Sequence, residues 1–124
     1  MSQRFLLDTH VLLWAVVGDP RFAPHHRRIV EAGEGLVVSV ISVWEISIKT
    51  STGKLRFDDD IARIARERSI ALLNIDERHA AAVRNLPLRH RDPFDRMLIA
   101  QAQVEGLTIL TSDRHFAAYA VDLA

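Results

Sequence analysis

The feature that most constrains the fold of this 124-residue chain is the alternation of short apolar runs with longer segments of helical spacing. Four runs of strand length stand at residues 4–7, 36–40, 70–73 and 107–110. Between them, apolar residues recur three or four positions apart, as they do on the buried face of a helix. Strands that alternate with helices usually form parallel sheets. The sequence therefore predicts an α/β fold with a central parallel sheet of four to five strands, flanked by helices.

Local signals place the ends of these elements. Helices are predicted at residues 10–17, 24–32, 58–68, 76–85 and 93–105, with one more running from a cap at Ser39 or Ser42 to residue 50. The best marked begins with Asp92 as N-cap and Pro93 at its first position. Residues 119–123 are expected to add an edge strand. Because no repeat, linker or low-complexity stretch divides the chain, we expect residues 1–124 to form a single domain.

Composition excludes several kinds of protein. Hydrophobic residues make up 48% and charged residues 26%, the balance of a globular protein rather than a disordered one. No apolar run is long enough to cross a bilayer, and the N-terminal stretch is interrupted by Asp8 and His10 and lacks a cleavage site. The chain has no cysteine, which excludes disulfides, thiolate metal sites and a cysteine nucleophile. We therefore expect a cytoplasmic protein without a membrane association.

The charges balance overall but are unevenly spread along the sequence. There are 16 basic and 16 acidic residues, so the chain lacks the excess of a strongly basic nucleic-acid binder. Residues 21–28 and 78–91 are nevertheless basic, and the second segment contains no acid. Residues 78–91 are therefore a candidate surface for RNA, although a solvated helix face is an equally good interpretation.

Four acidic residues stand where strands end or helices begin. Asp8 follows the first apolar run and Asp113 the last, while Glu45 and Asp95 are expected in the first turns of two helices. In open α/β sheets the ligand crevice lies at the carboxyl ends of the strands. We therefore expect the four side chains to converge at this edge of the sheet.

Four carboxylates repel one another unless a cation offsets their charge. Mg²⁺ and Mn²⁺ prefer such oxygen ligands, and they can activate a water and stabilise a phosphate undergoing hydrolysis. Each acid also has an ordinary explanation. Asp8 and Asp113 could be turn or cap residues, Glu45 could pair with Lys49, and Asp95 could favour the helix start. The hypothesis of a metal site therefore rests on the combination of the four.

Five further residues could touch substrate or support the acids: His10, Asp92, Arg96, Thr111 and Ser112. Asp92 is better explained as the cap of its helix than as a metal ligand. Arg96 could pair with a site carboxylate or meet a phosphate. The histidines lack the spacing of a zinc site, so we do not expect one.

Four motifs occur in order along the chain: LLDTHVLLW, SVISVWEISIK, HRDPFDRMLIAQA and LTILTSD. Together they resemble the PIN-domain ribonucleases, and most closely the VapC-type toxins of bacterial toxin–antitoxin pairs. The resemblance extends from Phe5 to Asp113 and so covers essentially the whole chain.

The resemblance implies a PIN-like three-layer sandwich and an endoribonuclease that depends on Mg²⁺ or Mn²⁺. It assigns the acidic roles to Asp8, Glu45, Asp95 and Asp113, with Asp8 and Asp95 as the most direct metal ligands. It further implies an RNA substrate, a homodimer and a small cognate antitoxin. His10 departs from the pattern, because many relatives carry asparagine or serine there, and its part in the site is therefore in doubt.

Three other functions remain open from the sequence. One is a PIN-type RNA-processing nuclease that is not a toxin, and another is an inactive PIN module that only grips RNA or a partner. The third is a phosphoryl-transfer enzyme with Asp8 as nucleophile, but this chemistry usually places a second aspartate two residues on, where His10 stands.

Overall fold

The computed structural model describes residues 3–124, and its centre is a four-stranded parallel sheet. The strands are β1 (Phe5–Leu7), β2 (Leu36–Ser39), β3 (Ala71–Leu73) and β4 (Thr108–Leu110). They lie side by side in the order β3-β2-β1-β4. After β1, the chain thus adds β2 and β3 on one side of that strand and then β4 on its other side. All four strands end at one edge, called here the carboxyl edge of the sheet.

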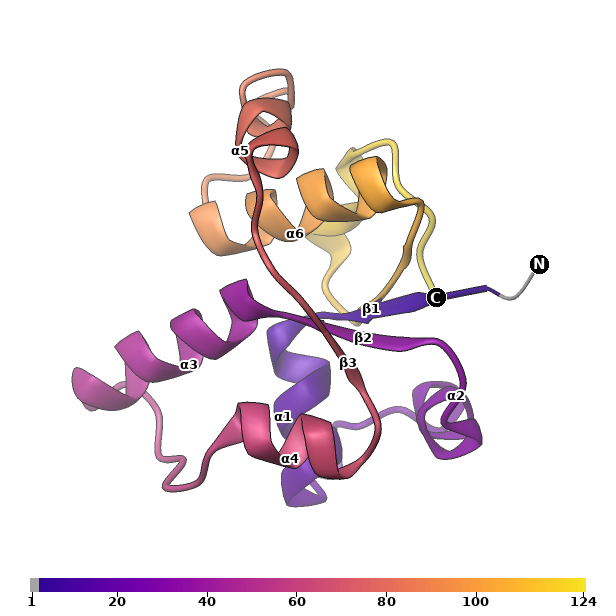
Figure 1. The fold of residues 1–124 in the computed structure, drawn as a ribbon, viewed down its shortest axis with the longest axis vertical. Coiled ribbons are helices and arrows are strands. Elements are labelled where there is room, and N and C mark those ends of the chain that lie inside the picture. The colour runs from indigo at the N-terminus through magenta and orange to yellow at the C-terminus, as the bar shows by residue number, and fades with distance from the viewer. Residues whose placement is uncertain (1–2) are drawn as a thin grey trace.

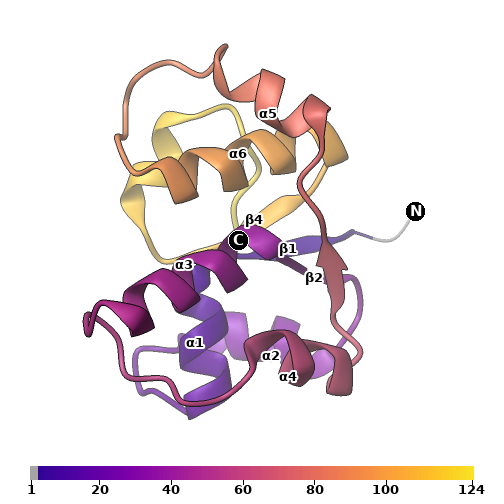
Figure 2. The ribbon, with the colours of Figure 1, turned by 60° about the vertical axis from the view of Figure 1, so that its left-hand side comes forward.

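Helices cover both faces of the sheet (Figures 1 and 2). The α-helices are α1 (Thr9–Val17), α2 (Pro24–Ala32), α3 (Val40–Ser51), α4 (Ile61–Glu67), α5 (Glu77–Val83) and α6 (Pro93–Glu105). In both views α5, α6 and the C-terminal segment lie on one side of the sheet, with α1, α2 and α4 on the other. This is the predicted three-layer α/β arrangement.

Alternation along the strands divides the core between the two layers. Leu6 and Ile109 belong to the core under α6, whereas Leu7, Val38 and Leu110 belong to the core over α1 and α4. All five side chains are fully buried. Since successive side chains of a strand point to opposite faces, a fully buried run is what a sheet covered on both sides requires.

The turn before β2 depends on a close approach between backbones. Gly35 has a φ of 67°, and a Cβ there would come within 2.5 Å of the carbonyl oxygen of Gln3. Its own carbonyl accepts a 2.8 Å hydrogen bond from the N–H of Phe5. Glycine at this position therefore lets β2 start close beside β1, which in turn sets the register of the two central strands.

Most helix ends agree with the sequence-based predictions. The helices at 24–32 and 93–105 have the predicted bounds, and Asp92 caps α6 by accepting from the N–H groups of Phe94 and Asp95. The choice between two caps for α3 falls on Ser39. Because α3 begins at Val40, Glu45 lies in its second turn and not in the first, as the sequence suggested.

The prediction of an edge strand at residues 119–123 is wrong. This segment forms a single parallel bridge between Leu123 and Ile109, preceded by a 3₁₀ turn at Arg114–Ala118. Tyr119 instead packs into the core, and its hydroxyl accepts hydrogen bonds from the N–H groups of Arg89 and His90. Within residues 3–124, no helix has the length and apolarity needed to span a membrane.

Candidate active site

The four candidate acids come from the carboxyl edge of the sheet and from two helices beside it. Asp8 directly follows β1, and Asp113 stands three residues after the end of the neighbouring β4. Glu45 is carried by α3, which continues directly from β2, and Asp95 lies in the first turn of α6. Since β2 and β4 flank β1, the acids surround the carboxyl end of the central strand.

Asp8 is buried, with an exposed fraction of 3%, and both of its carboxylate oxygens accept a hydrogen bond. One carboxylate oxygen accepts from the N–H of Val11, 2.9 Å away, so Asp8 also caps α1. The other accepts a hydrogen bond from the hydroxyl of Thr111. Burial raises the pKa of Asp8 above its ordinary value despite these two bonds. Its ionised form is therefore less stable than that of an exposed aspartate.

Glu45 is 2% exposed and is fixed by two partners. Its Oε1 accepts from the hydroxyl of Thr9 at 2.7 Å, and its Oε2 pairs with Nζ of Lys49 at 2.6 Å. The hydroxyl of Ser42 lies 2.9 Å from that of Thr9 and extends this buried chain. The pairing with Lys49, which the sequence left open, is thus present together with a polar contact to the start of α1.

The pKa of Asp95 is raised to about 6. Burial is the largest cause, and the negative charges of Asp92, Glu45 and Asp8 raise the pKa further. Nε2 of His90 donates to Oδ2 of Asp95 at 2.8 Å and partly offsets these effects. The mutual repulsion shows that the acids share one electrostatic environment.

Asp113 differs from the others because it is only half-buried. Burial acts to raise its pKa, but the N–H and ring of His115, at 2.9 and 2.8 Å, outweigh that effect and hold the pKa below its ordinary value. Asp8 and Asp113 line the same hollow of about 200 Å³, together with His10, Trp14, Arg21 and Ser112.

The oxygens of this site suit a hard divalent cation. Among residues 3–124, no hydrogen bond reaches Oδ1 of Asp95, Oδ2 of Asp113 or Oδ2 of Asp92. Potential ligand atoms of His90, Asp92 and Asp95 lie within 4.8 Å of one another. Partly buried carboxylates that repel one another and keep an oxygen without a hydrogen bond are what Mg²⁺ or Mn²⁺ would stabilise. The residues present therefore fit such an ion.

The secondary candidates separate into two groups. Thr111 and Ser112 adjoin Asp8 and Asp113, and exposed His10 lies at the mouth of the same hollow. Arg96 does not pair with any acid in the described part of the chain. Its guanidinium donates to the carbonyls of three residues and to the hydroxyl of a fourth: Val83, Leu86, Pro87 and Tyr119. It therefore holds the loop before α6, and of the two roles that the sequence allowed Arg96, pairing with a site carboxylate is absent among these residues.

Sequence reasoning missed His90, Thr9 and Ser42 as neighbours of the acids. His90 lies five residues before Asp95 in a segment without a regular element, so only the folded loop brings the two side chains together. The contact from Thr9 to Glu45 joins α1 to α3 across the carboxyl edge. Neither contact has a local sequence pattern, although the LDTH segment contains Thr9 next to Asp8.

Fold and site together define a parallel α/β protein with an acidic crevice at a sheet edge. The chain belongs to the PIN domain family, whose model matches residues 5–122. No curated protein sequence matches the chain.

Solved structures share the fold at low identity. A chain of the DNA-bound VapBC2 complex from Rickettsia felis superposes with a TM-score of 0.74 at 13% identity, covering 98% of both chains. A chain of DNA-bound VapBC from Salmonella typhimurium gives 0.71 at 19%, covering 99% of this chain and 98% of that one. A toxin–antitoxin complex from Klebsiella pneumoniae gives 0.66 at 19%, covering 99% and 96%.

Proposed function

We propose that this protein is an endoribonuclease that depends on Mg²⁺ or Mn²⁺ and acts as the toxin of a toxin–antitoxin pair. The observation that carries the proposal is the placement of Asp8, Glu45, Asp95 and Asp113 around the carboxyl edge, where neighbouring acids add to burial in raising the pKa of Asp8 and Asp95. The PIN family match supports a nuclease, and the toxin–antitoxin complexes among the structural neighbours support the toxin role.

In this proposal Asp8, Asp95 and Asp113 hold the ion through their carboxylate oxygens. When bound, the ion supplies positive charge for the phosphate and a more acidic water. Thr111 and the N–H of Val11 keep the Asp8 carboxylate in one orientation. The buried network around Glu45 keeps it at a fixed place, where it could accept a proton from a water that attacks the phosphate.

A cleavage assay with a labelled single-stranded RNA tests the nuclease function. Cleavage is expected with Mg²⁺ or Mn²⁺, and none with a chelator. Asp95→Asn and Asp8→Asn should each abolish it, whereas exposed Asp58→Asn, purified identically, should not. Cleavage that survives in both site variants would overturn the assignment of the active site. RNA binding by the wild type without any cleavage would instead indicate an inactive PIN module.

The toxin role needs a cellular test. Induction of the chain in a bacterial host should stop growth, and co-expression of a small protein encoded beside its gene should restore it. The same partner should copurify with the chain. A nuclease that is active in vitro but leaves growth unaffected would favour RNA processing over the toxin role.

A further inference from the structure

The loop between α1 and α2 places an arginine beside the acidic site. This residue, Arg21, lines the hollow of about 200 Å³ that also contains Asp8 and Asp113. In the described part of the chain, Arg21 forms an ion pair with Asp19 and with neither of these two acids. A positively charged side chain thus shares one hollow with two candidate metal ligands and is not paired with them.

Asp19 binds the guanidinium of Arg21 along one side only. Nε donates to Oδ1 of Asp19 at 3.0 Å, and Nη2 donates to Oδ2 at 2.8 Å. A guanidinium has a second fork, made by the outer N–H groups of Nη1 and Nη2. From Nη1 of Arg21, no hydrogen bond reaches any residue that the structure describes. The fork that suits an oxyanion therefore has no partner among these residues.

Further contacts fix the orientation of Arg21. Its guanidinium carbon lies 5.1 Å from the centroid of the Trp14 ring, within the range of a cation–π contact. Its backbone N–H donates to Oδ1 of Asp19 at 2.9 Å, and the N–H of Asp19 donates to the carbonyl of Trp14 at 3.0 Å. The next residue, Phe22, is buried in the core. Because the side chain is already held in place, it loses less conformational entropy when it binds a ligand.

We propose that Arg21 binds a phosphate group of RNA in this hollow; the proposal takes its ligand from the proposed function. Pockets for drug-sized ligands measure about 300 Å³ or more, so the smaller hollow suits a phosphate group better than a whole nucleotide. The planar fork of an arginine matches phosphate oxygens with two parallel hydrogen bonds. Asp8 and Asp113 alone repel an anion, and Arg21 provides attraction from the same hollow.

A comparison within the chain shows that an arginine on an aromatic ring is not enough. The guanidinium carbon of Arg27 lies 5.3 Å from the centroid of the Phe22 ring, and Arg27 is exposed. It belongs to the same basic segment as Arg21, at residues 21–28. It does not line the hollow, however, and no carboxylate of the described residues pairs with it. Arg21 alone of these two arginines is held beside the acids.

Fluorescence anisotropy with a labelled single-stranded RNA tests this role. The Asp95→Asn protein keeps the RNA intact and is compared with and without Arg21→Gln. This substitution should weaken binding about tenfold, because charge-assisted hydrogen bonds to the phosphate are lost. The slope of log K against log salt should become shallower by about 0.7. Arg21→Lys keeps the charge but not the fork, so it should retain the slope and recover only part of the affinity.

Arg27→Gln is the matched control, because it removes the same charge from the same basic segment. It should keep both the affinity and the salt dependence. Unchanged affinity in Arg21→Gln, or an equal loss in Arg27→Gln, would overturn the proposal. Full recovery of the affinity in Arg21→Lys would show that charge alone attracts the RNA, and it would equally overturn the role of the fork.

The cleavage assay separates this proposal from the proposed function. In the otherwise wild-type protein, Arg21→Gln should raise KM for the RNA, and Arg27→Gln should leave it unchanged. RNA binding that depends on Arg21, without any cleavage by the wild type, would leave the phosphate site standing while the proposed function fails. Cleavage by Arg21→Gln with unchanged KM and unchanged RNA affinity would remove the phosphate site and leave the proposed function standing.

Discussion

Nε2 of His90 lies 2.8 Å from Oδ2 of Asp95, while the ring of His90 stacks on that of His115, which in turn binds Asp113. This chain of contacts joins the start of α6 to the segment after β4 through side chains alone. Two candidate metal ligands from distant parts of the sequence are thereby held in a fixed relation. The ionised form of Asp95 is destabilised here, because burial and the neighbouring acids raise its pKa to about 6.

The raised pKa of Asp95 predicts how stability depends on pH in the absence of metal. The folded state holds the Asp95 proton more tightly than an exposed aspartate with a pKa of 3.8. This contribution to stability is present below pH 3.8 and is lost as the pH rises through about 6. Asp95→Asn mimics the neutral form, so in chelator at pH 8 it should melt higher than the wild type.

Thermal unfolding at pH 5 and pH 8, with chelator or Mg²⁺, measures this effect. The advantage of Asp95→Asn should shrink at pH 5, where the wild-type carboxyl is mostly protonated. It should disappear or reverse in Mg²⁺, because a bound cation stabilises the ionised wild type. A variant that melts below the wild type in chelator at pH 8 would show that the Asp95 carboxylate is not destabilising there.

The hydroxyl of Thr111 should matter more than its methyl group. It donates to buried Asp8 and accepts a 3.0 Å bond from the N–H of Asp113, so it links both strand-end acids. Thr111→Val leaves these groups without a partner and should cost about 1–3 kcal/mol of stability. It should also raise the pKa of Asp8 further, because the variant lacks a hydrogen bond that favours the carboxylate.

Chemical denaturation and Mg²⁺ titration calorimetry measure the two effects of Thr111→Val. Thr111→Ser keeps the hydroxyl and is the matched control, which should retain most of the stability and the metal affinity. If the serine variant loses stability and metal affinity while the valine variant keeps them, the methyl group and not the hydroxyl is the important part of Thr111.

How far the sequence anticipates this site depends on whether a feature is local. Caps such as Asp92 and Ser39 act on N–H groups two or three residues away, so their signals lie within a few positions. The strand ends at Asp8 and Asp113 follow from apolar runs for the same reason. His90 becomes a neighbour of Asp95 only through the folded loop, which no short pattern encodes. The prediction of an edge strand at 119–123 is wrong for a similar reason. Tyr119 in that segment packs into the core and accepts hydrogen bonds from the same loop, a contact between distant residues.

Lys49 and Glu45 should stabilise the folded state only when both charges are present. Glu45 is fully buried, whereas the side chain of Lys49 is 34% exposed. Lys49→Met removes the counter-charge from a buried carboxylate and should cost about 1–3 kcal/mol, less than for a fully buried pair. Glu45→Gln in the Lys49→Met background should restore part of this loss.

A double-mutant cycle by urea denaturation isolates the coupling between these two residues. A coupling energy near zero would contradict the pairing. Lys49→Met should also lower RNA cleavage, because it removes a positive charge close to the acidic site. Glu45 raises the pKa of Lys49 most, and the charges of Asp92 and Asp95 raise it as well. Lys54→Met, which removes an exposed lysine from the loop after α3, is the control.

Asp92 tests whether a capping aspartate can be separated from the metal site. Its Oδ1 accepts from the N–H groups of Phe94 and Asp95, whereas no hydrogen bond from residues 3–124 reaches its Oδ2. One of its carboxylate oxygens lies within 4.8 Å of one of Asp95. If capping is its role, Asp92→Ala should lose about 1 kcal/mol of stability and Asp92→Ser should recover most of it. Both variants should keep Mg²⁺ binding. Loss of Mg²⁺ binding in Asp92→Ser, as judged by calorimetry, would make Asp92 a ligand.

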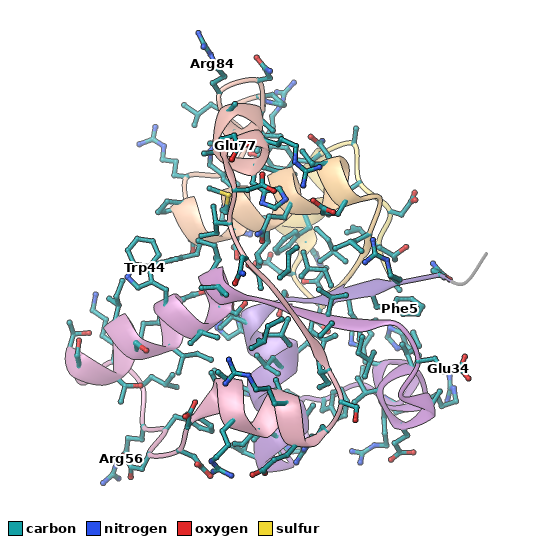
Figure 3. The ribbon with its side chains drawn as sticks, in the orientation of Figure 1. Phe5, Glu34, Trp44, Arg56, Glu77 and Arg84 are labelled. Atoms are coloured by element: carbon teal, nitrogen blue, oxygen red, sulfur yellow. The ribbon has the colours of Figure 1, made fainter. Side chains whose placement is uncertain are left out.

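The fold places the basic residues of segment 78–91 in different surroundings. Arg78 pairs with Asp76 and Glu105, both at 2.7 Å, and Figure 3 shows Arg84 at the far end of α5, pointing away from the sheet. Arg89 and Arg91 are exposed and flank His90, which contacts the acidic site. Of the basic residues in this segment, these two are best placed to meet the phosphates of a bound RNA.

Replacing Arg89 and Arg91 together by glutamine should therefore weaken RNA binding and flatten its dependence on salt. For single-stranded RNA, the slope of log K against log salt should become shallower by about 0.7 for each phosphate that the protein no longer neutralises. Binding is measured by fluorescence anisotropy with the inactive Asp95→Asn protein, so that the RNA stays intact. Arg84→Gln and Arg56→Gln, which remove the same charge from opposite ends of the molecule, should leave the slope unchanged. An equal effect in Arg56→Gln would mean that total charge, and not a site beside His90, attracts the RNA.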